Sequence, residues 1–289
     1  MMTDNGVLDL KAYIKARAAE IDAALVTFLP RQTLAGVGDM MKYAMFPGGK
    51  RFRPVLAVAA AEALGETSSR VMPAACAWEL MHAFSLVHDD LPCMDDDDMR
   101  RGKPTVHVQY GEAEALLAGD ALVIDAFRVA SLNGRVPGVR AEAVLAVIEE
   151  LALCAGYDGM VGGQVLDIQA MRRDTVTADE VVAIHRAKTG ALIRGAVRAG
   201  AMLSDARPDE LADLTAYAEN LGLVFQITDD LLDWGEEKES ASYPAVFGVE
   251  RSRELAEQAT AEAVARLERF GPAAEPLREL ARYLLRRQE

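Results

Sequence analysis

The part of the sequence best suited to chemistry is a dense run of carboxylates between Asp89 and Asp98. Six aspartates lie within these ten residues, directly after an apolar stretch that ends at Val87. Crowded carboxylates repel one another, and burial raises some of their pKa values unless cations compensate the charge. Their oxygen atoms suit Mg²⁺, which usually takes one or two carboxylates together with water and substrate phosphates. Taken alone, such a run is more often a solvated acidic loop than a metal site.

A second aspartate-rich segment changes that balance. Asp229 and Asp233 stand four residues apart in a predicted helix, so they lie on one helical face. Like charges at this spacing destabilise a helix, which indicates a compensating partner, although an exposed helical face remains the alternative. If the two acidic clusters face each other, metal ions between them could bridge to a diphosphate and make it a better leaving group.

Basic residues supply the opposite charge at three places. In the segment 48–54, two glycines and then Lys50, Arg51 and Arg53 lead into a predicted helix. Backbone N–H groups at a helix start and cations together attract anions. A second basic segment, 100–104, follows the first acidic run, and Lys188 interrupts a mostly apolar helix. Each could be a surface charge with a buried stem. In combination they predict an anion site beside the acidic clusters.

Helices must position these side chains, because helix signals dominate the chain. Apolar residues recur at three- and four-residue spacing, and no segment alternates in the manner of a strand, so a sheet is not expected. A capping box at Thr177 and Glu180 and several Gly and Pro breaks support the boundaries. The predicted helices are 8–29, 33–46, 54–65, 71–91, 110–132, 140–157, 178–203, 208–234, 249–269 and 273–287.

Composition narrows the class of protein. The net charge of −14 disfavours a nucleic-acid surface, and no apolar run has the ~18 residues that a membrane span needs. The first ten residues do not resemble a signal peptide. Cys76, Cys93 and Cys154 are too far apart for a zinc cluster and odd in number, which favours the cytoplasm. No linker or repeat divides the chain, so one all-α domain is expected over residues 1–289.

From about Tyr43 to the C-terminus, the order of motifs resembles the trans-isoprenyl diphosphate synthase family, and within it the bacterial farnesyl diphosphate synthases. The resemblance implies the isoprenoid synthase fold, a bundle of about ten or more helices around a central cavity. It also suggests a homodimer, for which the apolar segments 110–132 and 140–157 are candidate contacts. The matching segments are GGKRFRP (48–54), HAFSLVHDDLPCMDDDDMRRGKPTVH (82–107), GDALVIDAF (119–127), GMVGGQVLDI (159–168), HRAKTGALI (185–193), FQITDDLLD (225–233) and SYPAVFG (242–248).

The resemblance implies a role for each matching residue. The expected ligands of Mg²⁺, with three ions per active site, are Asp89, Asp90, Asp95, Asp229, Asp230 and Asp233. The expected isopentenyl diphosphate pocket contains Gly49, Lys50, Arg53, His82 and Arg101. Arg100 and Lys188 match contacts to the allylic diphosphate, and Lys188, Thr189 and Gln226 match catalytic groups near the reacting carbons.

The implied reaction joins isopentenyl diphosphate to dimethylallyl or geranyl diphosphate, gives farnesyl diphosphate and releases diphosphate. Phe84, five residues before Asp89, is expected to form the floor that stops chain growth, although ordinary core packing explains it equally well. Pro92 and Cys93 lengthen the motif as in bacterial farnesyl and plant-type geranylgeranyl enzymes, and the latter usually lack the aromatic residue. A geranyl or geranylgeranyl product is therefore the alternative.

Two other classes share parts of this pattern. A terpene cyclase would not need the isopentenyl pocket, so Lys50, Arg53 and His82 argue against it. A non-catalytic partner subunit tends to lose one aspartate motif, whereas this chain keeps both.

The segment after Asp233 departs from the family pattern. Family members usually carry a longer loop that ends in glycine-lysine, but Ser240 stands where the lysine is expected and Lys238 is a doubtful substitute. Either the loop is truly short, which puts full activity in doubt, or a mobile loop is missing from this sequence, which we favour. An intact mass well above 31.2 kDa would support the second explanation, and agreement with that mass would exclude it.

Overall fold

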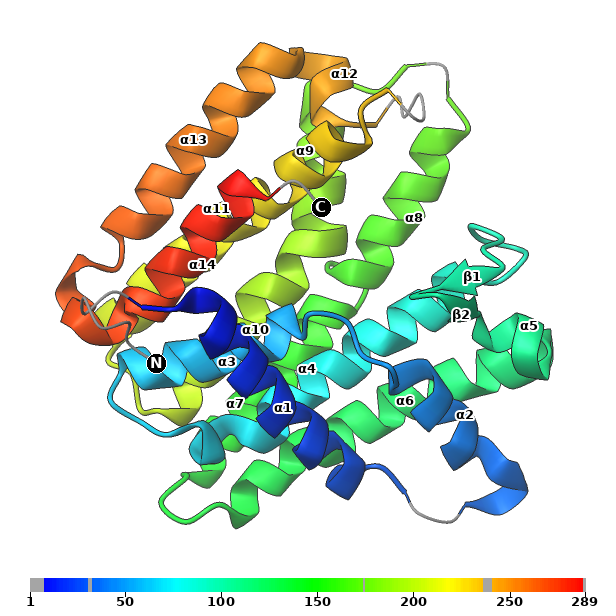
Figure 1. The fold of residues 1–289 in the computed structure, drawn as a ribbon, viewed down its shortest axis with the longest axis horizontal. Coiled ribbons are helices and arrows are strands. Elements are labelled where there is room, and N and C mark those ends of the chain that lie inside the picture. The colour runs from blue at the N-terminus through cyan, green and yellow to red at the C-terminus, as the bar shows by residue number, and fades with distance from the viewer. Residues whose placement is uncertain (1–7, 31–32, 174, 236–240, 288–289) are drawn as a thin grey trace.

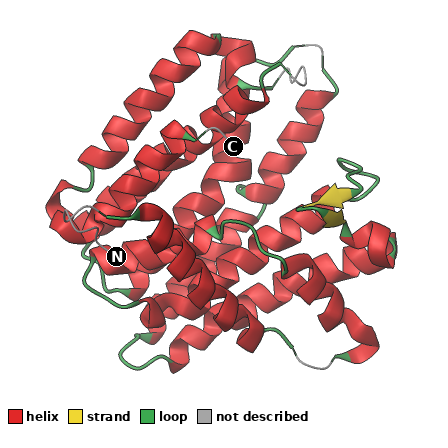
Figure 2. Ribbon diagram, in the orientation of Figure 1, coloured by secondary structure: helices red, strands yellow, loops and turns green. Residues whose placement is uncertain are grey.

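Helices form in every segment where the apolar spacing predicted them, and the all-α class is confirmed (Figures 1 and 2). The computed structural model describes residues 8–30, 33–173, 175–235 and 241–287. The longer helices are α1 (Leu10–Phe28), α2 (Val37–Met45), α3 (Phe52–Ala63), α4 (Ser68–Asp89), α6 (Glu112–Ser131), α7 (Ala141–Ala155), α8 (Met160–Met171), α9 (Ala178–His185), α10 (Ala191–Leu203), α11 (Pro208–Asp233), α13 (Val249–Ala265) and α14 (Glu275–Arg286). The short ones are η1 (Leu34–Gly36), α5 (Val106–Tyr110), η2 (Leu132–Arg135), η3 (Arg186–Gly190), α12 (Tyr243–Phe247) and η4 (Glu268–Ala274).

The observed helices differ from the predicted ones at several glycines. Helix α8 begins at the glycine-rich stretch 159–163, which has low helix propensity, and it was not predicted. The predicted helix 110–132 is divided by Gly111, whose φ is 113°. The predicted helix 178–203 begins at the expected capping box of Thr177 and Glu180, but it contains a π-helical turn, η3.

One hairpin was not expected from the sequence. Strand β1 (Met99–Arg100) pairs antiparallel with β2 (Lys103–Pro104), so the prediction that the chain forms no sheet is wrong at this point. Arg101 and Gly102 at the turn have φ values of 53° and 76°, as in the tight turns that join two strands. Strands of two residues are too short to show an alternating pattern.

The buried core lies where α3, α4 and α10 pack together, with α6 against α4 and α11 against α10. A continuous apolar cluster joins Tyr13 in α1 to Leu284 in α14. Helices α4 and α11 both pack in this core, and each has an aspartate as its last residue. None of the helices in the described part of the chain is long and apolar enough to cross a membrane.

Candidate active site

Both aspartate clusters lie at the electrostatically unfavourable end of a helix. Asp89 is the last residue of α4, and Asp233 is the last residue of α11. The C-terminal end of a helix carries partial negative charge, so carboxylates there are destabilised unless a cation lies nearby. The stability of the helices therefore does not explain why aspartates stand at these positions.

In the first cluster, each aspartate has a different environment. Asp89 accepts a hydrogen bond from Gln164 Nε2 at 2.9 Å, and burial raises the pKa of its carboxyl to about 6. Asp90 is buried and accepts from Arg100 Nε at 2.6 Å. Asp95 is exposed on the loop after α4, yet partial desolvation still raises its pKa.

The second cluster has partners on two other elements. Asp229 forms an ion pair with Arg287, which follows α14, while burial raises the pKa of the Asp229 carboxyl to about 6. Asp230 accepts hydrogen bonds from Gln226 Nε2 at 2.7 Å and from the backbone N–H of Tyr243 at 2.8 Å. Burial raises the pKa of Asp230 to about 6 as well. Asp233 is exposed.

An ion pair lies near both clusters. Lys188 Nζ, on the π-turn η3, donates to Asp167 Oδ2 at 2.6 Å. The negative charge of Asp167 contributes to the raised pKa of Asp95 in the first cluster and of Asp230 in the second. Asp89 lines the same cavity as Lys188. His185, the residue before η3, lies 3.8 Å from Asp230, so both clusters lie near this pair.

Desolvated carboxylates with hard oxygen atoms fit a divalent cation such as Mg²⁺. Their raised pKa values show that charging them without a cation is unfavourable. No three ligating side chains among the described residues form a ready-made site. An ion between the clusters would therefore need further ligands, and the oxygen atoms of a substrate phosphate could supply them.

A cavity of about 450 Å³ extends from the first cluster. Its rim is polar, with Asp89, Gln164, Lys188 and Thr189, and its wall is mainly apolar. Phe84 lines this wall, and its expected role as the floor that stops chain growth stays a prediction. The apolar lining residues are Phe84, Leu86, Met94, Met160, Val161, Val165 and Ile168.

A smaller cavity of about 180 Å³ brings together the residues expected to bind isopentenyl diphosphate. Arg53 and His82 line both cavities, so the two share a wall. Burial, and then the charges of Arg53 and Arg101, lower the pKa of His82 well below its ordinary value, so its imidazole is neutral. The lining includes Gly49, Lys50, Arg53, His82, Arg101 and Arg287.

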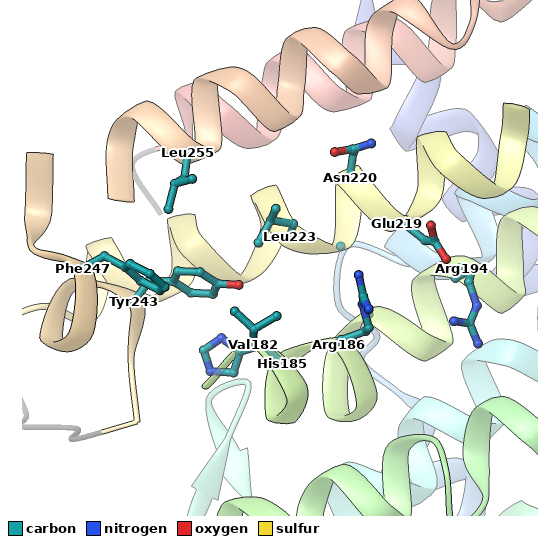
Figure 3. A pocket seen from close by; sticks show the side chains of 12 residues that line it. Val182, His185, Arg186, Arg194, Glu219, Asn220, Leu223, Tyr243, Phe247 and Leu255 are labelled. Atoms are coloured by element: carbon teal, nitrogen blue, oxygen red, sulfur yellow. The ribbon is translucent and has the colours of Figure 1, made fainter. Parts of the chain in front are cut away.

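The π-turn η3 contributes residues both to the larger cavity and to a further hollow of about 390 Å³, whose lining side chains are drawn in Figure 3. Lys188 and Thr189 line the first, whereas His185 and Arg186 line the second together with Tyr243 and other residues of α11 to α13. His185 Nδ1 lies 3.8 Å from Asp230 Oδ2, which links this hollow to the second cluster. π-helical turns are frequent at functional sites, and this one turns Lys188 and Thr189 toward the larger cavity.

Sequence reasoning missed three residues of the site. Gln164 and Asp167 stand three residues apart in α8, a spacing that could have placed them on one face had the helix been recognised. Arg287 had no local signal, because an arginine near a chain end usually lies on the surface. Conversely, Arg51 of the basic segment is structural: it is buried and donates to Asp22 and Glu79 at 2.8 and 2.7 Å.

Ser240 and Lys238 lie outside the described residues, so the two explanations for the short segment after Asp233 stay predictions.

The chain is similar to several known enzymes. The family model for polyprenyl synthetase matches residues 35–245. A chloroplastic geranylgeranyl pyrophosphate synthase of Catharanthus roseus is 40% identical over 291 residues, which cover 96% of this chain and 81% of that protein. The crystal structure of an FPP/GFPP synthase from Zymomonas mobilis, 37% identical, superposes with a TM-score of 0.90 and covers 96% of this chain and 99% of its own.

A geranyltransferase structure from Legionella pneumophila is 32% identical, with a TM-score of 0.89 over 96% of this chain and 97% of its own. Enzymes of this family generally use Mg²⁺. Since the family model covers most of the chain and relatives match it along nearly its whole length, the chain belongs to the polyprenyl synthetase family and is a prenyltransferase of the trans-isoprenyl diphosphate synthase type.

Proposed function

We propose that this enzyme joins isopentenyl diphosphate to an allylic diphosphate and that its main product is geranylgeranyl diphosphate. The observation that carries the reaction is the shared wall of Arg53 and His82 between the two cavities. One cavity is small and basic, and the other is apolar with carboxylates at its rim. This arrangement suits two diphosphates whose carbon ends meet, one of them with a long apolar tail.

The chain's own residues hold the two substrates in place. Lys188 and Arg100 would bind the allylic diphosphate, while Gly49, Lys50, Arg53, Arg101 and Arg287 would bind isopentenyl diphosphate around the neutral His82. When bound, Mg²⁺ neutralises the leaving diphosphate; we expect three ions, held by Asp89, Asp90, Asp95, Asp229, Asp230 and Asp233. No side-chain nucleophile is needed.

Thr189 and Gln226 are the polar side chains that we expect near the reacting carbons. Thr189 lines the cavity, and Gln226 lies one turn before Asp230, to which it donates. Their oxygen atoms would stabilise the allylic cation that forms when the C–O bond breaks. The apolar wall excludes water, so the double bond of isopentenyl diphosphate attacks instead, and a proton then leaves to the released diphosphate.

Two observations bear on product length. The similarity to geranylgeranyl synthases favours a twenty-carbon product over the farnesyl product that Phe84 suggested. A farnesyl product is the second candidate, because the phenyl ring of Phe84 stands on the cavity wall and the Zymomonas mobilis relative is an FPP/GFPP synthase. We expect Phe84→Ala to lengthen the product in either case, and an unchanged product would place the floor elsewhere.

Incubation with Mg²⁺, isopentenyl diphosphate and dimethylallyl, geranyl or farnesyl diphosphate tests the proposal. We expect linear prenyl diphosphates up to twenty carbons, with length measured by mass spectrometry after phosphatase treatment. A cyclised hydrocarbon would indicate a terpene cyclase instead, and no product from any starter would indicate a non-catalytic partner subunit.

The proposal extends to assembly and location. Exposed apolar residues on α6 and α7, among them Ile124 at 71% and Leu145 at 67%, favour a homodimer built from these helices. Cys76, Cys93 and Cys154 are all unpaired, which favours a reducing compartment such as the cytoplasm.

A further inference from the structure

Phe84 and His88 form an aromatic pair on the wall of the larger cavity. They stand one helical turn apart in α4, with ring centroids 4.8 Å apart and planes at 75° to each other. This edge-to-face arrangement is an attractive one for aromatic rings. Both side chains line the cavity. The phenyl ring is therefore held partly by the imidazole and not by the α4 backbone alone.

The imidazole is anchored to the neighbouring helix, α6. Its Nε2 atom lies 3.0 Å from the backbone carbonyl oxygen of Leu116. A carbonyl only accepts hydrogen bonds, so Nε2 carries the proton and donates it. This bond crosses from α4 to α6 and restricts the orientation of the ring.

Gly119 provides the space that the imidazole needs. A Cβ atom at this position would lie 2.1 Å from Nε2 and 2.3 Å from Cδ2 of His88, which is far inside van der Waals contact. Any side chain at position 119 would thus push the ring away from α6. The conformation of Gly119 is ordinary for any residue, since it lies within helix α6 without a positive φ. Close approach, and not backbone freedom, requires a glycine here.

We propose that His88, seated against Gly119, is a positioning residue that sets where the Phe84 ring stands and thereby the length at which the prenyl chain stops growing. This inference rests on the proposed function, because it names a determinant of product length for that reaction. His88 acts through Phe84: the slot on α6 holds the imidazole, and the imidazole holds the phenyl ring at its place on the wall.

The geometry predicts opposite effects for two substitutions. His88→Ala empties the slot between α4 and α6, so the Phe84 ring can move into it and the product becomes longer. Gly119→Ala pushes the imidazole off α6 toward Phe84 and the cavity, so the product becomes shorter. The energy of an aromatic pair corresponds to a change of up to about tenfold in the ratio of neighbouring chain lengths.

The experiment compares product distributions by mass spectrometry, with all starters and at equal extents of reaction. Both shifts should vanish in the Phe84→Ala background, because the residue through which His88 acts is then absent. His88→Gln retains a donor for the Leu116 carbonyl and should shift the product less than His88→Ala. His107→Ala is the matched control, since His107 Nε2 also lies 3.0 Å from a backbone carbonyl, that of Asp97, but does not line the cavity. It should leave product length unchanged.

The wild-type enzyme in the same series tests the proposed function, and the shift relative to wild type tests the role of His88. Unchanged distributions for His88→Ala and Gly119→Ala, with active wild-type enzyme, would overturn the role. Shifts of equal size in the Phe84→Ala background would overturn it too, because they would not pass through Phe84. Should His88→Ala not fold, Gly119→Ala and His88→Gln decide the question.

Discussion

At the scale of single residues, the negative charges of the carboxylates at the ends of α4 and α11 are only partly compensated by partners within the protein. Asp89 ends its helix, is desolvated and has Gln164 as its hydrogen-bond donor. Asp229 lies near the end of its helix and is paired with Arg287. Ionisable groups that are desolvated in this way and have shifted pKa values are typical of functional sites.

We expect Asp89→Asn to keep the fold and to lower kcat by at least about a hundredfold, because charge stabilisation at the leaving group is lost. Steady-state kinetics with geranyl diphosphate measure the loss, and circular dichroism measures the fold. Asp96→Asn is the control, since Asp96 is an exposed aspartate of the same run. Near-normal turnover of Asp89→Asn would refute the role of this carboxyl.

The raised pKa values predict a pH dependence. With carboxyl pKa values near 6 for Asp89, Asp229 and Asp230, the folded protein binds more protons than the unfolded chain between about pH 4 and 6. The contribution of these groups to the free energy of unfolding therefore falls as the pH rises through this window.

Binding of Mg²⁺ with inorganic diphosphate favours the ionised carboxylates, so it should release protons at about pH 6 and fewer at about pH 8. Calorimetric titration in two buffers measures this release. Asp229→Asn should release fewer protons at about pH 6 than the wild type. Equal release from both proteins would show that Asp229 does not titrate on binding.

At the scale of elements, the π-turn η3 depends on the approach of α8. A Cβ atom at Gly163 would lie 2.3 Å from the backbone nitrogen of Lys188 and 2.7 Å from its Cα atom. Backbone atoms cannot move aside as a flexible side chain can. The α8 glycine thus allows η3 to place Lys188 and Thr189 at the cavity.

We expect Gly163→Ala to displace η3, to lower kcat at least about tenfold and to reduce the free energy of unfolding by about 1–3 kcal/mol. Gly134→Ala is the control, because a Cβ atom there meets nothing within 4 Å. Kinetics and urea denaturation measure the two effects. Full activity of Gly163→Ala would show that the turn tolerates the shift.

The end of α14 brings a cation to the second cluster. Arg287 pairs with Asp229, and its guanidinium carbon lies 4.5 Å from the centre of the Phe225 ring. It also lines the smaller cavity. Helix α14 therefore completes a pocket whose other basic residues come from the other half of the chain.

We expect Arg287→Ala to raise the KM for isopentenyl diphosphate about tenfold or more, with a smaller effect on the KM for the allylic substrate. Arg286→Ala serves for comparison, because Arg286 is mostly exposed and its ion pair is with Glu279 at 3.6 Å. Equal effects of the two substitutions would assign Arg287 a structural role.

At the scale of the whole molecule, we propose that the chain folds as one domain, because the apolar cluster from Tyr13 to Leu284 joins its first and last helices. Helices α6 and α7 keep several exposed apolar side chains outside this core. Ile124 and Leu145 are among them, and exposed apolar side chains that form a patch mark an interaction surface.

Sedimentation velocity should show a dimer for the wild type and a monomer, or a much weaker dimer, for Ile124→Lys and Leu145→Lys. A charge is costly in a buried interface but not on a free surface. Leu34→Lys is the control, since Leu34 is 92% exposed and lies in η1, outside the two helices proposed to form the interface. Dimers of unchanged strength in all three variants would place the interface elsewhere.

The sequence by itself determined the helical class, the two aspartate clusters and the basic segments, because helix periodicity and charge are local properties of the chain. Only the tertiary structure decided which groups meet. Asp89 meets Gln164 across 75 residues, and Asp229 meets Arg287 across 58 residues. Such contacts depend on how α4, α8, α11 and α14 pack, which periodicity within one helix does not specify. For the same reason the sequence alone did not indicate that two elements approach closely at Gly119 and at Gly163.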